Sequence, residues 1–218
     1  MVMNNIDEII KYYRKELKNS SVAISYLKDT RKLTAETINY FKIGYAPSNP
    51  TCNIEYHDRI MLPIKNTLGE YVAFTGRTLS ETNESKYKNS FESPDYQKGR
   101  ILYGFSDSLS YIQETESVFL VEGQFDFLTL WQNGIKNVVA GSGTGFTPIH
   151  ARLLSRYAQN VYLCFDADDA GKKATMKVQR LLQDTGLITS IGTFPAGEDP
   201  DSLVRKNGIN AFLACFSK

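Results

Sequence analysis

The chain has 218 residues, of which 42% are hydrophobic and 22% are charged, a balance typical of a globular protein with a real core. Its formal net charge of +1 offers no global electrostatic case for nucleic-acid binding, so any basic surface must be local. Apolar runs such as 118–121 and 161–165 are far shorter than the ~20 residues of a membrane-spanning helix. The N-terminus lacks the basic-then-apolar layout of a secretory signal, so we expect a cytoplasmic protein that contacts no membrane.

The cysteines and histidines form no recognisable site. Cys52, Cys164 and Cys215 are an odd number with no C-x-x-C spacing, which argues against both a disulfide framework and a zinc knuckle. We therefore expect buried or incidental thiols and no zinc site in this chain. His57 and His150 are isolated, without a partner pattern for metal binding or acid–base chemistry, so the sequence assigns them no role.

The first part of the chain predicts a small mixed α+β subdomain. Apolar positions at helical spacing predict a helix over about 6–27, and Thr34 is a suitable N-cap for a short second helix over 34–41. Further on, β-type runs at 60–64 and 71–74 are joined by T-L-G-E, which is the pattern of a β-hairpin.

From Val118 onward, short apolar runs alternate with helical patterns. We expect strands at 118–121, 137–140, 161–165 and 188–194, and helices at 124–132, 148–158 and 170–183. Four continuous apolar strands separated by helices predict an α/β fold, with a largely parallel sheet covered on both faces.

Carboxylates follow three of the expected strands. Glu122 comes directly after the first strand, and Asp126 lies one helical turn later on the same face. Asp166 and Asp168 follow the third strand, and Asp199 and Asp201 follow the fourth. Ligands of an open parallel sheet bind at the carboxyl ends of its strands, so these side chains are candidates for one site.

Such a cluster of acids carries a cost, because like charges at close range raise one another's pKa and repel. A bound cation removes that cost, and carboxylates without histidine or cysteine favour Mg²⁺ or Mn²⁺ over zinc. Paired ions could then stabilise the attacking and leaving oxygens of a phosphoryl displacement. The alternative interpretation is that acids after strands serve as helix N-caps and solvated turn residues.

At these residues the sequence resembles the Toprim fold shared by bacterial-type primases, topoisomerases and some nucleases. The two signature turns are E-G-Q-F-D at 122–126 and D-A-D-D-A-G at 166–171. The rest of the chain resembles, in order, the catalytic core of DnaG-type primases, through I-G-Y-A-P (43–47), R-I-M-L-P-I (59–64), F-T-G-R (74–77), K-Y-K-N-S (86–90), K-G-R-I-L-Y-G (98–104), V-A-G-S-G-T (139–144) and E-D-P-D (198–201).

The resemblance implies roles for particular residues. The catalytic acids would be Glu122, Asp126, Asp166 and Asp168, and the metal ligands would be Glu122, Asp166, Asp168, Asp199 and Asp201. The template and the nucleotide phosphates would lie against Arg59, Arg77, Lys86, Asn89 and Lys98. Backbone N–H groups of the small-residue turn 142–144 could also meet phosphate. By spacing alone, the basic residues would instead be read as solvated surface.

Two departures from the family pattern stand out. Asp166-Ala167-Asp168 replaces the usual Asp-Gly-Asp, which affects local turn geometry only. The N-terminal zinc module and the C-terminal helicase-binding module of DnaG-type primases have no counterpart in the sequence. We therefore expect either an excised core or a compact relative for which a helicase or a zinc-binding module is supplied elsewhere.

The resemblance predicts a Toprim-type domain over 111–218, preceded by a basic subdomain over 1–110. The expected function is Mg²⁺- or Mn²⁺-dependent synthesis of an RNA primer from nucleoside triphosphates on single-stranded DNA, in a bacterial cytoplasm, with the gene bacterial, phage-borne or plasmid-borne. Two alternatives stay open: a Toprim-type metal-dependent nuclease, and a non-catalytic module that binds single-stranded DNA or a replisome partner.

Overall fold

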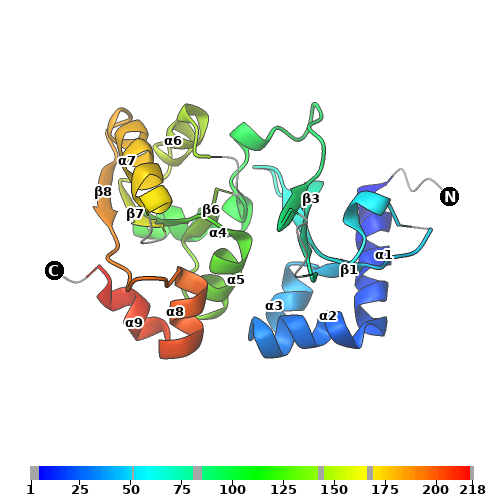
Figure 1. Cartoon of the computed structure of the whole chain (residues 1–218). Coiled ribbons are helices and arrows are strands. Elements are labelled where there is room, and N and C mark those ends of the chain that lie inside the picture. The colour runs from blue at the N-terminus through cyan, green and yellow to red at the C-terminus, as the bar shows by residue number, and fades with distance from the viewer. Residues whose placement is uncertain (1–4, 51, 81–84, 142–144, 166–168, 217–218) are drawn as a thin grey trace. The chain divides into compact units, whose positions relative to one another are not determined.

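The computed structural model describes residues 5–50, 52–80, 85–141, 145–165 and 169–216, with the side chains of residues 169 and 170 left out. Its contacts divide the chain into two compact units, Met1–Tyr96 and Gln97–Lys218 (Figure 1). Residues 97–110, which the sequence grouped with the upstream subdomain, therefore pack with the second unit. None of the described helices is both long and apolar enough to cross a membrane.

The helices of the first unit follow the expected pattern with one break. They are α1 (Ile6–Asn19), α2 (Ser21–Ser25), the π-helical turn η1 (Tyr26–Thr30) and α3 (Ala35–Tyr40). The single helix expected over 6–27 is interrupted at Ser20, whose hydroxyl accepts the N–H of Ala23 and so starts a new helix. The Thr34 hydroxyl accepts the N–H of Thr37 at 3.2 Å, which confirms the expected N-cap of α3.

The sheet of the first unit is antiparallel, and its order is β1-β2-β3-β4. Its strands are β1 (Gly44–Ala46), β2 (Arg59–Lys65), β3 (Tyr71–Thr78) and β4 (Tyr87–Asn89), and the 3₁₀ turn η2 (Ile54–Tyr56) precedes β2. The pairing of β2 with β3 confirms the expected hairpin. Helix α1 covers one face of this sheet, where the Tyr13 ring meets the edge of Phe74 at 5.5 Å.

The second unit is the α/β fold that the sequence predicts. Its elements are η3 (Lys98–Arg100), α4 (Phe105–Thr115), β5 (Ser117–Val121), α5 (Gln124–Gln132), β6 (Val138–Ala140), α6 (Pro148–Leu154), β7 (Asn160–Cys164), α7 (Asp169–Gln183), β8 (Ile188–Ile191), α8 (Pro200–Asn207) and α9 (Ile209–Ala214). The strands pair in parallel in the order β6-β5-β7-β8, which confirms the expected sheet.

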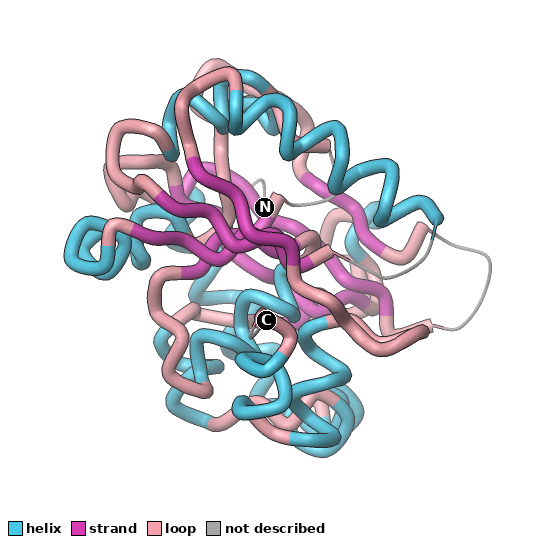
Figure 2. Tube along the Cα trace, turned by 90° about the vertical axis from the view of Figure 1, so that its left-hand side faces the viewer, coloured by secondary structure: helices cyan, strands magenta, loops and turns pink. Residues whose placement is uncertain are grey.

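Helices lie on both faces of this parallel sheet, as Figure 2 shows. On one face, Leu120 and Leu163 join a core with apolar residues of α4, α6 and α7. On the other face, Phe119 stacks on Tyr162 with ring centroids 4.6 Å apart, and Phe212 of α9 packs against Phe119. Because both faces are buried, the strands consist of continuous apolar runs.

The segment before α4 is fixed to the edge of the same sheet. Tyr103 and Ala140 exchange two backbone hydrogen bonds, of 2.9 and 3.0 Å, so the segment extends the sheet beyond β6. The next residue, Gly104, has φ +78° and lies so close to the Phe127 ring that a Cβ would overlap it. Only glycine fits this position, both for its backbone conformation and for its packing.

Candidate active site

The carboxyl ends of the two central strands form the switch point of the parallel sheet. From β5 the chain crosses to β6 on one side, whereas β7 and then β8 lie on the other. Ligands of open α/β sheets bind at such a point. Glu122 is half-buried directly after β5. Asp166 and Asp168 come after β7, and the turn 142–144 comes after β6, but these residues lie outside the described part of the chain.

Asp126 lies in the first turn of α5, close behind Glu122. One carboxylate oxygen accepts the N–H of Gly123 at 3.0 Å, and the other accepts the N–H of Asp201 at 3.1 Å. Burial raises the pKa of Asp126 well above its ordinary value, and the nearby carboxylates of Asp199 and Asp201 raise it further. The two backbone donors act in the opposite direction. Burial and the neighbouring acids therefore both disfavour the charged form of Asp126.

Asp201 is the most buried of the described acids, with 1% of its surface exposed. Its Oδ1 accepts the hydroxyl of Thr129 at 2.6 Å and the Nε of Arg205 at 2.9 Å. Its backbone N–H donates to Asp126, so helices α5 and α8 are joined by a polar network in the interior. A buried carboxylate needs such partners, because an unpaired one would be strongly destabilising.

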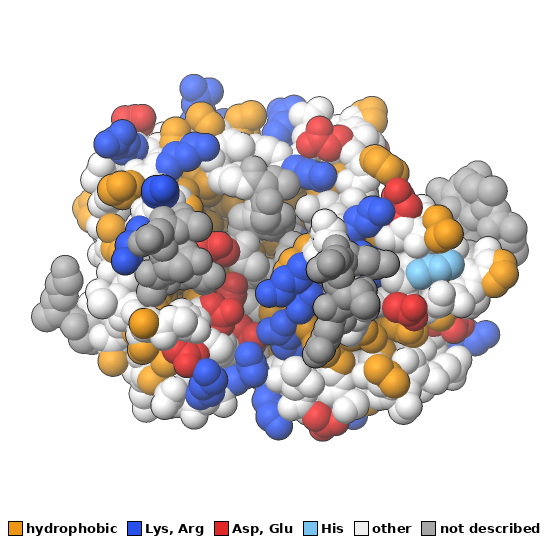
Figure 3. Space-filling model, viewed as in Figure 1, with side chains coloured by type: hydrophobic (Ala, Val, Ile, Leu, Met, Phe, Trp, Pro, Cys, Tyr) orange, Lys and Arg blue, Asp and Glu red, His pale blue; other side chains and the backbone are white. Residues whose placement is uncertain are grey.

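Asp199 is the N-cap of α8. Its Oδ1 accepts the N–H of Ser202 at 2.6 Å, and its own N–H donates to the Ser202 hydroxyl at 3.0 Å. Asp199 therefore does serve as a helix N-cap, which was the alternative interpretation of the acids that follow strands. It does not remove Asp199 from the cluster, because the Asp199 carboxylate also raises the pKa of Asp126. On the face shown in Figure 3, acidic side chains gather on this unit.

The donor set suits a hard divalent cation. Asp126, Asp199 and Asp201 offer carboxylate oxygens at a place where their own charges repel, and a cation would relieve that repulsion. Within the described ranges, no three His, Cys, Asp or Glu side chains are placed so that they could hold an ion together. The predicted ligands Asp166 and Asp168 lie outside those ranges.

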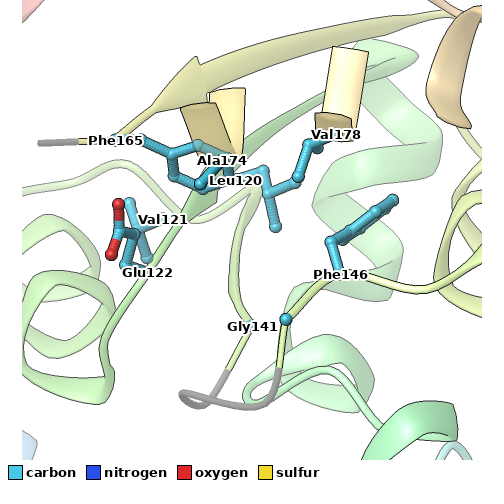
Figure 4. Close-up of a pocket in the computed structure, with 9 residues that line it drawn as sticks. Leu120, Val121, Glu122, Gly141, Phe146, Phe165, Ala174 and Val178 are labelled. Atoms are coloured by element: carbon cyan, nitrogen blue, oxygen red, sulfur yellow. The ribbon is translucent and has the colours of Figure 1, made fainter. Parts of the chain in front are cut away.

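A small cavity lies at the same edge of the sheet (Figure 4). Its volume is about 100 Å³, and its walls are mainly apolar, with Leu120, Phe146 and Val178 among them. Figure 4 shows the Glu122 carboxylate at the side of this cavity away from Phe146. The cavity beside Glu122 is therefore mainly apolar.

In the first unit, Arg59 is buried rather than presented to solvent. Its side chain is 4% exposed, and Nη1 donates to the carbonyls of Gly76 at 3.3 Å and Ser85 at 2.9 Å. These bonds tie β3 to the chain just before β4. The geometry therefore gives Arg59 a structural task, whatever else it contacts.

Three other predicted binding residues share the hairpin of β3 and β4. The Arg77 guanidinium lies over the Tyr87 ring, 5.3 Å from its centroid, and Nη1 donates to the Lys86 carbonyl at 3.4 Å. The Lys86 side chain is exposed. Asn89 accepts the hydroxyl of Thr75. The hairpin thus brings Arg77, Lys86 and Asn89 into one small region.

Lys98 belongs to the other unit, where η3 packs on α6. The Thr147 hydroxyl, from the residue before α6, donates to the Gly99 carbonyl at 2.7 Å. His150, to which the sequence gave no role, is fully buried beside this turn. The sequence held one signal of it, since Thr147 and His150 stand at the spacing of a capping box and Pro148 follows Thr147.

Comparison with known proteins agrees with both halves of the chain. The Toprim-like family profile matches residues 119–204, and the profile of the DNA primase catalytic core N-terminal domain matches residues 49–109. The solved catalytic core of E. coli primase is 31% identical, with a TM-score of 0.83 over 97% of this chain and 78% of that one. The chain belongs to the family of DnaG-type primase catalytic cores.

Other members of the family extend this similarity. A DnaG primase catalytic domain solved with single-stranded DNA is 33% identical, with a TM-score of 0.83 over 96% of this chain and 76% of that one. The Aquifex aeolicus primase structure, which holds zinc-binding and RNA polymerase domains, is 32% identical, with a TM-score of 0.89 over 96% of this chain and 59% of that one.

The family's curated sequences are longer than this chain. The DNA primase of Legionella pneumophila is 36% identical over 96% of this chain and 42% of its own length, and that of Aquifex aeolicus is 34% identical over 93% and 46%. The chain therefore spans less than half the length of these relatives and corresponds to their catalytic core.

Proposed function

We propose that this chain is a primer-synthesising core that joins ribonucleotides on a single-stranded DNA template. In each step the 3′ oxygen of the growing RNA would form a bond to the α-phosphorus of an incoming nucleoside triphosphate. The bond from that phosphorus to the bridging oxygen would break and release pyrophosphate. The observation that carries the proposal is the acidic switch point, in a fold that matches primase cores over nearly the whole chain.

The proposed metal ligands are Glu122, Asp166, Asp168, Asp199 and Asp201, with Asp126 as a further catalytic acid, and the proposed ion is Mg²⁺ or Mn²⁺. When bound, such ions would align the two reacting groups and neutralise the developing charge. The chain's own task is to hold these oxygens in place before the substrates arrive. The buried bonds of Asp126 and Asp201 support this task, since they fix both carboxylates without needing an ion.

The proposed contacts to template and nucleotide phosphates are Arg77, Lys86 and Asn89 on the hairpin, with Lys98 on η3. Arg59 would act mainly by supporting the hairpin from behind, because its Nη1 already binds two backbone carbonyls. We further propose that residues 1–110 and 111–218 divide template binding and chemistry between them, and that a replicative helicase is a partner.

Primer synthesis tests this proposal directly. The protein is incubated with single-stranded DNA, the four ribonucleoside triphosphates and Mg²⁺ or Mn²⁺, and short RNA is measured for the wild type and for Asp166→Ala combined with Asp168→Ala. We expect RNA from the wild type and none from the variant. Equal activity of the two proteins would contradict the proposal.

Two further measurements separate the alternatives. Metal-dependent nicking of DNA without added nucleotides, in place of RNA synthesis, would indicate a nuclease. An absence of Mn²⁺ binding in calorimetry, with unchanged DNA affinity in the acid-to-alanine variant, would indicate a binding module without catalysis.

A further inference from the structure

The turn that carries Lys98 is held against the N-terminal end of α6 by the side chain of Thr147. Thr147 donates its hydroxyl to the Gly99 carbonyl at 2.7 Å, and a Cβ at Gly99 would already touch the Thr147 methyl group at 3.4 Å. The turn thus lies directly on Thr147. Beyond the turn, the pairing of Tyr103 with Ala140 and the packing of Gly104 on Phe127 fix the segment a second time.

His150 lies beneath the same turn in a defined protonation state. The N–H of Thr147 donates to Nδ1 at 3.3 Å, so Nδ1 is an acceptor and the neutral ring carries its proton on Nε2. Burial lowers the pKa of His150 to about 4, whereas backbone groups of Lys98 and Ile101 act to raise it. Groups that raise the pKa of a histidine favour its protonated form, so these are carbonyls that face the ring.

The Nε2–H group of His150 is a buried donor. Nε2 is buried and forms no hydrogen bond of normal geometry with any described residue. A buried donor of this kind calls for a physical reason, because leaving it unbonded is costly. The backbone carbonyls of Lys98 and Ile101 are its candidate acceptors, because both act to raise the pKa of His150.

From these contacts we infer that His150 is a positioning residue for Lys98: together with Thr147 it clamps the 98–101 turn so that the Lys98 ammonium meets nucleoside triphosphate. The inference rests on the proposed function, in which Lys98 binds nucleotide phosphate. His150 touches neither substrate nor metal in this scheme. It acts by holding the backbone of Lys98 in one place, which reduces the conformational entropy that Lys98 loses when it binds nucleoside triphosphate.

The two nitrogens of His150 can be tested separately. His150→Asn keeps an acceptor near Nδ1 for the Thr147 N–H but removes the donor near Nε2. His150→Gln keeps a donor near Nε2. We expect the KM for nucleoside triphosphate to rise about five-fold in His150→Asn, as for the loss of one hydrogen bond. We expect kcat to change less than about two-fold, and His150→Gln to stay close to wild type, because the donor is retained.

A double-mutant cycle with Lys98→Ala decides whether the effect passes through Lys98. We expect Lys98→Ala to raise KM about ten-fold and His150→Asn to add nothing to it, since coupled residues are not additive. An unchanged KM in His150→Asn, or an equal rise in both backgrounds, would overturn the inference. A wild-type KM in Lys98→Ala would overturn it as well, and an absence of RNA synthesis by the wild type would instead refute the proposed function.

Two controls protect this test from effects on folding. Ser108→Ala removes a buried hydroxyl that donates to the Val138 carbonyl at 2.6 Å in the same unit, so it should lower thermal stability and leave KM unchanged. If His150→Asn fails to fold, Thr147→Val serves instead, because it keeps the shape and removes the donor to Gly99. KM should then rise in Thr147→Val and recover in Thr147→Ser, and equal KM values in both would contradict the clamp.

Discussion

The acids of the parallel-sheet unit and the basic residues of the antiparallel-sheet unit reach their positions by different routes. Asp126 and Asp201 meet across 75 positions of sequence, through a buried hydrogen bond between two helices. Arg77, Lys86 and Asn89 are neighbours because one hairpin brings them together. Substitutions among the acids should therefore affect folding as well as chemistry, whereas substitutions on the hairpin should affect binding in smaller steps.

The largest effect is expected at Glu122. Glu122→Gln keeps the shape of a side chain that is half-buried at the end of β5 and removes its charge. We expect primer synthesis to fall at least ~100-fold, because an ion ligand contributes several kcal/mol to the reaction. Glu114→Gln, an exposed position at the end of α4, is the matched control and should keep full activity. Similar activities in the two variants would remove Glu122 from the site.

The next effect concerns stability and compares two ion pairs of α8. Arg205→Ala leaves the Asp201 carboxylate buried without its cation and should lower the free energy of unfolding by about 3 kcal/mol. Lys206→Ala breaks the more exposed pair with Glu198 and should cost much less, because solvent screens that pair. Urea unfolding measures both. Equal losses would mean that the interior network is not what joins α5 to α8.

The third effect is a pH dependence that arises at His150. Burial lowers its pKa from 6.5 to about 4, so below pH 6.5 the unfolded chain binds a proton that the folded chain does not. Stability is therefore lost as pH falls, by about 2 kcal/mol between pH 7 and pH 5 from this residue. In His150→Gln this part of the pH dependence should vanish. Parallel profiles for the two proteins in urea unfolding would contradict the assignment.

The smallest effect separates two lysines of the hairpin. Lys86→Ala should weaken binding of single-stranded DNA. It should also reduce the slope of log K against log salt concentration by about 0.7, because a protein with one phosphate contact fewer releases fewer counterions on binding. Lys88→Ala is the matched control, since Lys88 already pairs with Glu55 at 3.4 Å. Fluorescence titrations at several salt concentrations measure both slopes. The hairpin loses its proposed role if the slope in Lys86→Ala equals that of the wild type.

Much of the fold follows from periodicity alone. The apolar runs at 118–121 and 161–165 predict the two central strands to within a residue, since both faces of a parallel sheet are buried. The break at Ser20 was not predicted, because the apolar spacing continues across it. It depends on a side-chain cap, which competes locally with the helix.

The site was predictable in part. Strand-end placement predicts that Glu122 and Asp126 belong to one site, and the structure has Glu122 directly after β5 and Asp126 in the first turn of α5. Sequence spacing cannot show that Asp201 donates to Asp126, or that Thr129 and Arg205 enclose Asp201, because those contacts arise only when α8 packs on α5. The burial of Arg59 and His150 is hidden for the same reason, since it depends on how neighbouring elements pack around them.

The two edges of the parallel sheet also differ, and this bears on how the protein behaves in concentrated solution. The β6 edge is covered by the segment that contains Tyr103, whereas β8 pairs only with β7 among the described residues. On β8, Ile188 is 63% exposed and Ile191 is 44% exposed. An apolar strand edge of this kind is where another polypeptide can add and start aggregation. A lysine at position 188 would block that addition, far from the acids, and is the natural first change for improving solubility.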